Sequence, residues 1–259
     1  MQSAALTAAA IPIAYAAWDV EPPDLATVLG FFTTENVAGN VTVPHKQAAS
    51  RLCGRLTAVA RVVGAVNTFW VEDGVLVGDN TDVGGFHNAV VRLRGAVPAR
   101  TRIALLGGGG AAAAVVAAAA GWPRCEVRLW NRTHERAVAL AARFPGVATP
   151  VRSALDALAG ASLVVHATSI GMMNDEMPID PFLIPSGADV IDLVYRPGET
   201  AWVRAARAEG HRACDGLPML VEQGALAFER WFGQPPDRAA MWRAVGEAPA
   251  GASRPLGRR

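Results

Sequence analysis

The most unusual absence in this 259-residue sequence is lysine, which occurs only once, at Lys46. The other basic residues are all arginine, and 23 acidic residues nearly balance the 24 basic ones, so the formal charge is +1. Such a balance gives no electrostatic reason to expect nucleic acid or a membrane surface as a partner. Most of the arginines are therefore interpreted as solvated surface charges.

Cysteine is also scarce, and long hydrophobic runs are lacking. The three cysteines, Cys53, Cys125 and Cys214, are widely spaced and contain no CxxC pair, which argues against a disulfide framework or a zinc site. We interpret them as reduced thiols of a cytoplasmic protein. The start of the chain has no basic segment, so no signal peptide is expected, and the apolar run 111–120 is too short to span a bilayer.

What the sequence does contain is an alternation of strand-like and helix-like segments. In the first part we predict helices at 3–10, 24–33 and 47–62, and strands at 13–20 and 37–43. A hairpin is predicted over 65–82, with Asp73-Gly74 as its turn. Strands that alternate with helices are typical of an α/β layer.

A second pattern begins near Arg102. Continuous apolar strands are predicted at 102–107, 125–131, 162–169 and 188–195, with helices after the first two. Such strands indicate a parallel sheet that is buried on both faces. We therefore predict an α/β fold of two domains: an N-terminal α/β substrate domain and a Rossmann-like nucleotide-binding domain. The expected boundaries are 1–83 for the first domain, 84–97 for a connecting helix, 98–215 for the second domain, 216–245 for helices that return to the first, and 246–259 for a disordered tail.

A glycine-rich turn, residues 107–110, lies between the first strand of the second pattern and an alanine-rich helix. Glycine lets backbone amides approach a pyrophosphate, and the helix N-terminus favours negative charge. Ala112 occupies the third glycine position of the usual GxGxxG pattern. A tight strand-to-helix connection without a ligand is the alternative for the turn alone.

The end of the next strand carries Asn131, Arg132, Thr133 and Arg136, and no acidic residue. NAD-binding folds usually place an acidic residue there, which holds the ribose hydroxyls. Two guanidinium groups suit a 2′-phosphate instead, because each can donate two hydrogen bonds to it. The predicted cofactor is therefore NADP, and the alternative is that the two arginines are ordinary helix surface charges.

The single lysine closely follows Pro44 in the stretch NVTVPHK, residues 40–46. Asp82, Asn67 and Thr42 are all expected at sheet ends, where open α/β sheets bind their ligands. A lysine beside an aspartate could transfer a proton to or from a hydroxyl. A plain surface ion pair is the alternative that spacing alone leaves open.

Several stretches together resemble the shikimate dehydrogenase family. They run in family order from about residue 3 to residue 242: NVTVPHK (40–46), GAVNT (64–68), GDNTD (78–82), GGGGAAAA (107–114), NRT (131–133), HATSIGM (166–172), DLVYRP (192–197) and GLPMLVEQGA (216–225). The resemblance implies NADPH-dependent reduction of 3-dehydroshikimate to shikimate, in aromatic amino-acid biosynthesis. We expect a monomer or a homodimer.

The resemblance also implies roles for individual residues. Lys46 and Asp82 correspond to the catalytic pair. Substrate contacts are implied for Thr42, Asn67 and Gln223, toward ring hydroxyls, and for Tyr195, toward the carboxylate. Cofactor contacts are implied for Gly107, Gly109, Gly110 and Ala111 at the pyrophosphate, for Asn131, Arg132, Thr133 and Arg136 at the 2′-phosphate, and for Thr168 and Met219 near the nicotinamide. His166 stands where the family commonly has asparagine.

One family feature is not found in the sequence. The family begins with an extra strand and a loop whose two serines hold the substrate carboxylate, whereas Gln2 and Ser3 already align with the first helix. We expect a misassigned start, with about 15–25 further residues upstream, because a missing central strand is hard to tolerate. The alternatives are a relative acting on quinate or an amino-substituted analogue, and a non-catalytic NADP-binding relative.

Overall fold

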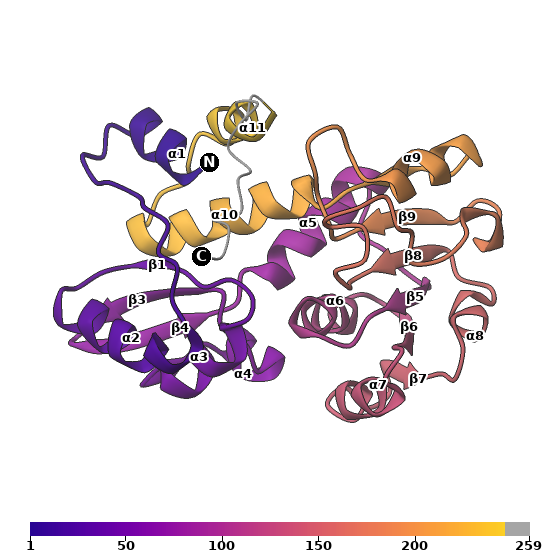
Figure 1. Ribbon diagram of the computed structural model, residues 1–259, viewed down its shortest axis with the longest axis horizontal. Helices are drawn as coiled ribbons and strands as arrows, with labels where there is room; N and C mark the ends of the chain where they lie inside the picture. The colour runs from indigo at the N-terminus through magenta and orange to yellow at the C-terminus, as the bar shows by residue number, and fades with distance from the viewer. Residues whose placement is uncertain (247–259) are drawn as a thin grey trace.

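The computed structural model describes residues 1–246, which form two β-sheets surrounded by helices (Figure 1). The first sheet has four strands in the order β1-β3-β4-β2, and the second has six strands in the order β10-β9-β8-β5-β6-β7. The long helices α5 (Asp82–Arg94) and α10 (Leu217–Phe232) lie side by side and run from one sheet toward the other. This arrangement confirms the predicted two-part α/β fold.

The first sheet is built around a hairpin. Its strands are β1 (Gly39–Asn40), β2 (Arg55–Leu56), β3 (Thr68–Glu72) and β4 (Val75–Asp79). Strands β3 and β4 pair antiparallel, and Asp73 and Gly74 between them have φ of 53° and 73°. Two successive left-handed residues are what a two-residue type I′ turn requires, so the predicted hairpin and its turn are confirmed.

The predicted helix 47–62 is wrong, because two helices and a short strand occupy this segment. Helix α3 (Lys46–Leu52) ends before Gly54, strand β2 pairs parallel with β4, and α4 (Ala58–Val63) then begins. Thr57 caps α4, since its side chain accepts a hydrogen bond from the backbone N–H of Ala60. Glycine in a helix interior costs about 1 kcal/mol relative to alanine, which favours a break at Gly54.

The predicted strand 13–20 is also wrong, since residues 11–21 form no regular secondary structure. A strand needs the N–H and C=O groups of a neighbour, and no strand of residues 1–246 pairs with this segment. Its aromatic side chains lie partly exposed against other rings: Trp18 against Phe32, and Tyr15 against Trp231. The predicted strand 37–43 shrinks to β1, because Val41 bonds Asn67 as a single contact and a turn follows.

The second sheet is parallel throughout and follows the predicted order of elements. Its strands are β5 (Arg102–Leu106), β6 (Glu126–Trp130), β7 (Ala148–Pro150), β8 (Leu163–His166), β9 (Asp189–Asp192) and β10 (Ala213–Cys214). One face packs on α5, α6 (Gly110–Ala120) and α7 (His134–Ala141), and the other packs on α8 (Ala154–Leu158) and α9 (Ala201–Ala208). The sheet is therefore covered on both faces, as its continuous apolar strands predicted.

The remaining elements are helices at the two ends of the chain and two short 3₁₀ turns. They are α1 (Gln2–Ala8), α2 (Leu25–Thr34), α11 (Arg238–Gly246), and the turns Pro22–Asp24 and Pro181–Leu183. Helices α1, α10 and α11 share one apolar cluster. Apart from Gly246, the predicted disordered tail lies outside the described residues. Within residues 1–246, no helix is both long and apolar enough to cross a membrane.

Candidate active site

Lys46 and Asp82 meet, although 36 residues separate them in the sequence. Lys46 is the first residue of α3 and Asp82 is the first residue of α5. The lysine Nζ donates to Asp82 Oδ2 at 2.7 Å, and the side chains are 21% and 6% exposed, respectively. The ammonium group is therefore fixed by a buried carboxylate while it stays reachable from solvent, which a plain surface pair would not require.

Asn67 holds the other side of this carboxylate. Its amide Nδ2 lies 2.9 Å from Asp82 Oδ1, and its Oδ1 accepts the backbone N–H of Thr81 at 2.8 Å. Asn80 adds a further restraint, because its Oδ1 accepts the backbone N–H of Asp82 at 3.1 Å. Both oxygens of Asp82 are thus engaged, and the carboxylate can hardly rotate away from the lysine.

Gln223, on α10, contacts Asn67. Its Oε1 accepts from Asn67 Nδ2 at 3.1 Å, and its own Nε2 donates to the backbone oxygen of Leu220 at 2.9 Å. Gly85 allows this approach, since a Cβ atom there would lie only 2.7 Å from the Cβ of Gln223. Close packing of α5 against α10 therefore brings together residues from three distant parts of the sequence.

The glycine turn lies at the carboxyl edge of the second sheet. Gly107 has a φ of 132°, and a Cβ there would lie 2.5 Å from the backbone oxygen of Ala167. Among the described residues, in contrast, nothing fills the space where a Cβ of Gly109 or Gly110 would point, and no side chain caps the N-terminus of α6. The first N–H groups of a helix lack partners inside the helix, so this end can bind an anion, with Ala111 in its first turn.

The predicted phosphate-binding residues lie beside that turn. A Cβ on Gly108 would be 3.3 Å from Asn131 Cγ and 3.2 Å from Arg136 Cβ, so these residues border the glycine turn. Asn131 Nδ2 donates to the backbone oxygen of Thr133 at 2.8 Å and fixes the loop that carries Arg132. Arg132 and Arg136 are exposed, and within residues 1–246 neither forms an ion pair.

The two halves of the site share one core. Ala65, which leads into Asn67, belongs to the same apolar cluster as Ala112 and Ala113 of α6 and as Met219 of α10. Arg143, after α7, also donates to the backbone oxygen of Val62 at 2.7 Å. The segments that carry the Lys46 pair and the glycine turn are therefore packed against each other.

Two predicted substrate residues are not joined to the Lys46–Asp82 pair. Thr42 is exposed, and within residues 1–246 its hydroxyl has one hydrogen bond, to the backbone oxygen of Val43 at 3.5 Å. Tyr195 follows β9 with 48% of its surface exposed, and its hydroxyl has no partner within residues 1–246. Thr168, in contrast, lies beside the glycine turn, since a Cβ on Gly107 would be 3.2 Å from its methyl carbon.

Comparison with known proteins assigns the family. The protein-family model for the shikimate dehydrogenase substrate binding domain matches residues 1–69, and the family model for the shikimate 5′-dehydrogenase C-terminal domain matches residues 216–245. A shikimate dehydrogenase (NADP(+)) of Mesorhizobium japonicum is 43% identical over 238 residues, which is 89% of this chain and 84% of that protein. The chain belongs to the shikimate dehydrogenase family. The corresponding protein of Methylocella silvestris is 44% identical over 241 residues, 90% of this chain and 85% of that protein.

The fold agrees with this membership in the shikimate dehydrogenase family. The crystal structure of shikimate 5-dehydrogenase from Thermus thermophilus, in complex with NADP(H) and shikimate, is similar to the chain with a TM-score of 0.84. The two are 37% identical in sequence, and the match covers 94% of this chain and 91% of that one. The predicted family is thereby confirmed.

Sequence reasoning missed three residues of this candidate active site. Thr81 and Asn80 lie within the GDNTD stretch and orient Asn67 and Asp82. Gly85 was also missed. The roles of Asn80 and Thr81 could have been predicted in part, because polar residues between a strand and a helix often form hydrogen bonds with nearby backbone groups. The role of Gly85 depends on its contact with α10, which no local pattern reveals.

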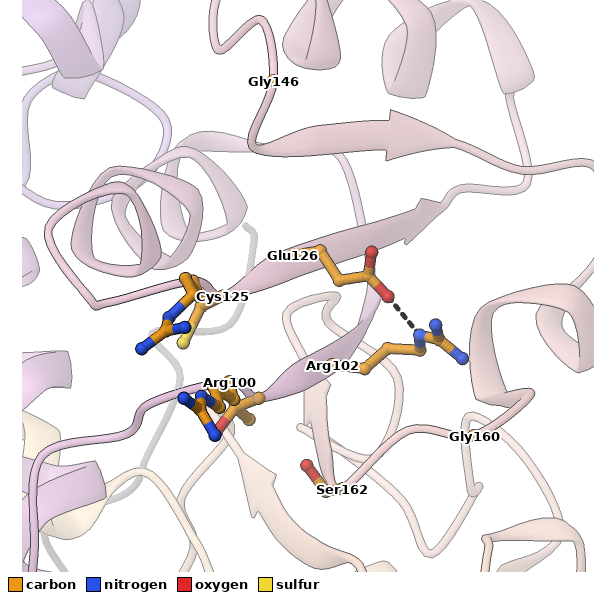
Figure 2. Close-up of a pocket in the computed structure, with 9 residues that line it drawn as sticks. Arg100, Arg102, Cys125, Glu126, Gly146, Gly160 and Ser162 are labelled. Atoms are coloured by element: carbon orange, nitrogen blue, oxygen red, sulfur yellow. Dashed lines mark hydrogen bonds and ion pairs between the residues drawn. The ribbon is translucent and has the colours of Figure 1, made fainter.

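A separate cavity of about 670 Å³ lies at the opposite edge of the second sheet (Figure 2). It is lined by residues at the amino ends of β5, β6 and β8, among them Arg100, Arg102, Cys125 and Ser162. Arg102 is paired there with Glu126. Because the glycine turn is at the carboxyl ends of the same strands, this cavity is no part of the candidate active site.

Proposed function

We propose that this protein catalyses the reversible, NADP-dependent reduction of 3-dehydroshikimate to shikimate. The observation that carries the proposal is the 2.7 Å contact between Lys46 Nζ and Asp82 Oδ2. Asn67 donates to the other oxygen of Asp82 and is itself in contact with Gln223. The family relatives named above support the reaction, since their names give both shikimate dehydrogenase and NADP(+).

The residues of the second sheet fit NADP. The uncapped N-terminus of α6 and the open space above Gly109 and Gly110 suit a pyrophosphate. Arg132 and Arg136, supported by Asn131 and Thr133, would hold a 2′-phosphate through charge-assisted hydrogen bonds. Thr168 and Met219 are assigned to the nicotinamide end. When bound, NADPH supplies the hydride for the carbonyl carbon.

The residues of the first sheet then supply the proton. As the carbonyl oxygen gains electrons, the ammonium group of Lys46 gives it one proton, and the product is a hydroxyl group. Asp82 keeps the ammonium group aimed at that oxygen and stabilises its charge before transfer. The partial exposure of Lys46 lets solvent return the proton after each turnover. In the reverse direction the neutral amine of Lys46 accepts the hydroxyl proton, and the carbon gives its hydride to NADP.

Substrate orientation is assigned to four further side chains. The amides of Asn67 and Gln223 and the hydroxyl of Thr42 can exchange hydrogen bonds with ring hydroxyls, and Tyr195 can donate to the carboxylate. Asn67 already has more acceptors within reach than its two N–H hydrogens can serve: Thr81 Oγ1 at 3.0 Å, Asp82 Oδ1 at 2.9 Å and Gln223 Oε1 at 3.1 Å. A substrate hydroxyl can therefore replace Gln223 as one of its partners.

We further propose that the two parts of the chain divide the two ligands. Residues 1–83 and 216–245 would form the substrate domain, residues 98–215 the NADP domain, and 84–97 the connecting helix. The observed helix α5 begins at Asp82 and ends at Arg94, because Gly95 takes a left-handed conformation with a φ of 79°. Light scattering would test the expected monomer or homodimer.

The test is a spectrophotometric assay at 340 nm. Purified protein should oxidise NADPH when 3-dehydroshikimate is added, and it should reduce NADP when shikimate is added. Quinate, in place of shikimate, distinguishes the alternative substrate. Binding of NADP without any change of absorbance, with both shikimate and quinate, would refute the proposed reaction.

A further inference from the structure

A fully buried histidine connects the two strands next to the glycine turn. His166 is the last residue of β8, and its neighbours in register are Leu106 on β5 and Asp192 on β9. Its side chain is 0% exposed, and the ring of Trp202 packs against it at an interplanar angle of 77°, with ring centroids 5.7 Å apart. A fully buried imidazole needs partners for both ring nitrogens, because water cannot reach them.

Both ring nitrogens have partners. His166 Nδ1 lies 2.8 Å from Asp192 Oδ1, and Nε2 lies 2.5 Å from the hydroxyl of Thr168. The carboxylate of Asp192 is itself held, because it accepts from the hydroxyl of Thr200 at 2.8 Å and from the backbone N–H of Val194 at 3.0 Å. A carboxylate only accepts, so Nδ1 carries a hydrogen and donates it to Asp192, and Nε2 shares the second hydrogen bond with the hydroxyl of Thr168.

Thr168 connects His166 to the glycine turn. Its hydroxyl points to His166 and also accepts the backbone N–H of Ile170 at 3.2 Å, while its methyl group lies beside Gly107. Gly107 is itself pressed against the backbone of Ala167, where no Cβ would fit. The position of Thr168 thus sets the spacing between the end of β8 and the glycine turn.

From this geometry we infer that His166, oriented by Asp192, is a positioning residue for the cofactor. It fixes the rotamer of Thr168, and through Thr168 it fixes the side of the glycine turn that faces β8. This inference rests on the proposed function, because it assigns that side to NADP. It also gives a role to a histidine in the place where the family resemblance has asparagine.

A double-mutant cycle on NADP affinity tests whether His166 acts through Thr168. The variants are His166→Asn, Thr168→Val and the double variant, and NADP affinity is measured by calorimetric titration of the full-length protein. We expect about tenfold weaker NADP binding for each single variant, and a double variant within about twofold of either. His211→Asn is the matched control, since it removes another buried histidine, whose Nδ1 is 3.0 Å from the backbone oxygen of Ala188. NADP affinity should stay unchanged in this control.

A second measurement does not need the His166 variant to fold. In the ¹⁵N spectrum of the wild-type protein, His166 should show a protonated Nδ1 and a separate Nε2 signal. Thr168→Val should shift the Nε2 signal and leave Nδ1 nearly unchanged, and added NADP should shift Nε2 in the wild-type protein only.

The outcomes separate this inference from the proposed function. About hundredfold weakening in the double variant, unchanged NADP affinity in both single variants, or equal weakening in His211→Asn would overturn the inference. Wild-type protein that binds NADP without turning over shikimate would refute the reaction alone, and the cycle would still decide the role of His166. Wild-type protein that binds no NADP would overturn both.

Discussion

Replacement of Gly85 by alanine tests how closely α10 must approach α5. A Cβ atom at position 85 would lie 2.7 Å from the Cβ, 2.9 Å from the backbone nitrogen and 3.0 Å from the Cα of Gln223. Carbon atoms in ordinary contact are about 3.5–4.0 Å apart, so α10 must retreat by roughly 0.8 Å. The Asn67 Nδ2 to Gln223 Oε1 distance, now 3.1 Å, would then approach about 3.9 Å, which is no hydrogen bond.

The expected cost follows from two opposing effects. Overpacking of a helix interface usually costs about 1–3 kcal/mol, and alanine in place of glycine within a helix returns up to about 1 kcal/mol. We therefore expect Gly85→Ala to lower the free energy of unfolding by about 0–2 kcal/mol. The value of kcat/KM for shikimate should also fall, by about tenfold, because Gln223 loses its hydrogen bond to Asn67.

Gly84→Ala is the matched control for this experiment. A Cβ at position 84 would lie 2.6 Å from Leu226 Cδ1, which is the end of a flexible side chain and can rotate away. Urea unfolding and the assay at 340 nm, run on both variants, give stability and kcat/KM. If Gly85→Ala were as active as Gly84→Ala, the close approach of α10 would not position Gln223.

Four further predictions concern single substitutions. Lys46→Met should lower kcat by at least about 10² while calorimetry gives an unchanged NADP affinity, and survival of turnover would exclude Lys46 as the proton donor. Arg132→Ala should weaken NADP about tenfold or more with little effect on NAD, and equal losses for the two cofactors would contradict a phosphate contact. Gly74→Ala should destabilise the hairpin by about 1 kcal/mol in urea unfolding without changing kcat/KM, because its φ is 73° and its Cβ would meet open space. Burial, reinforced by nearby Asp215, raises the pKa of the Cys214 thiol from 9.0 to about 12. The stability that this protonated thiol contributes is therefore fully present below pH 9 and is lost as pH rises from about 9 toward 12. Between pH 8 and 10.5 the free energy of unfolding should fall less in Cys214→Ala than in the wild-type protein, and identical pH profiles would contradict the burial of this thiol.

Local signals explain which parts of the fold could be predicted. The turn at Asp73-Gly74 and the continuous apolar strands of the second sheet each carry their own pattern, and the structure confirms both. The segment 13–20 has the apolar character of a strand, yet a strand exists only beside a partner. The break at Gly54 was missed for a related reason, since β2 forms by pairing with β4 and not by its own preference.

The site was predictable only where motifs mark it. Spacing alone could not show that Lys46 contacts Asp82, and the family resemblance supplied that expectation. The contact of Gln223 with Asn67 depends on how two helices cross, so it required the structure. The buried bond between His166 and Asp192 is similar, because strand register brings the two residues together.

The scarcity of lysine makes the proposed active site chemically addressable. Lys46 is the only lysine in the sequence, and it is partly exposed beside Asp82. Within this sequence, Lys46 is therefore the one side chain that amine-selective reagents can label. Reductive methylation with ¹³C-formaldehyde would place a single side-chain probe in the protein, whose signal would report the ionisation of Lys46 and the arrival of each ligand without any engineered substitution.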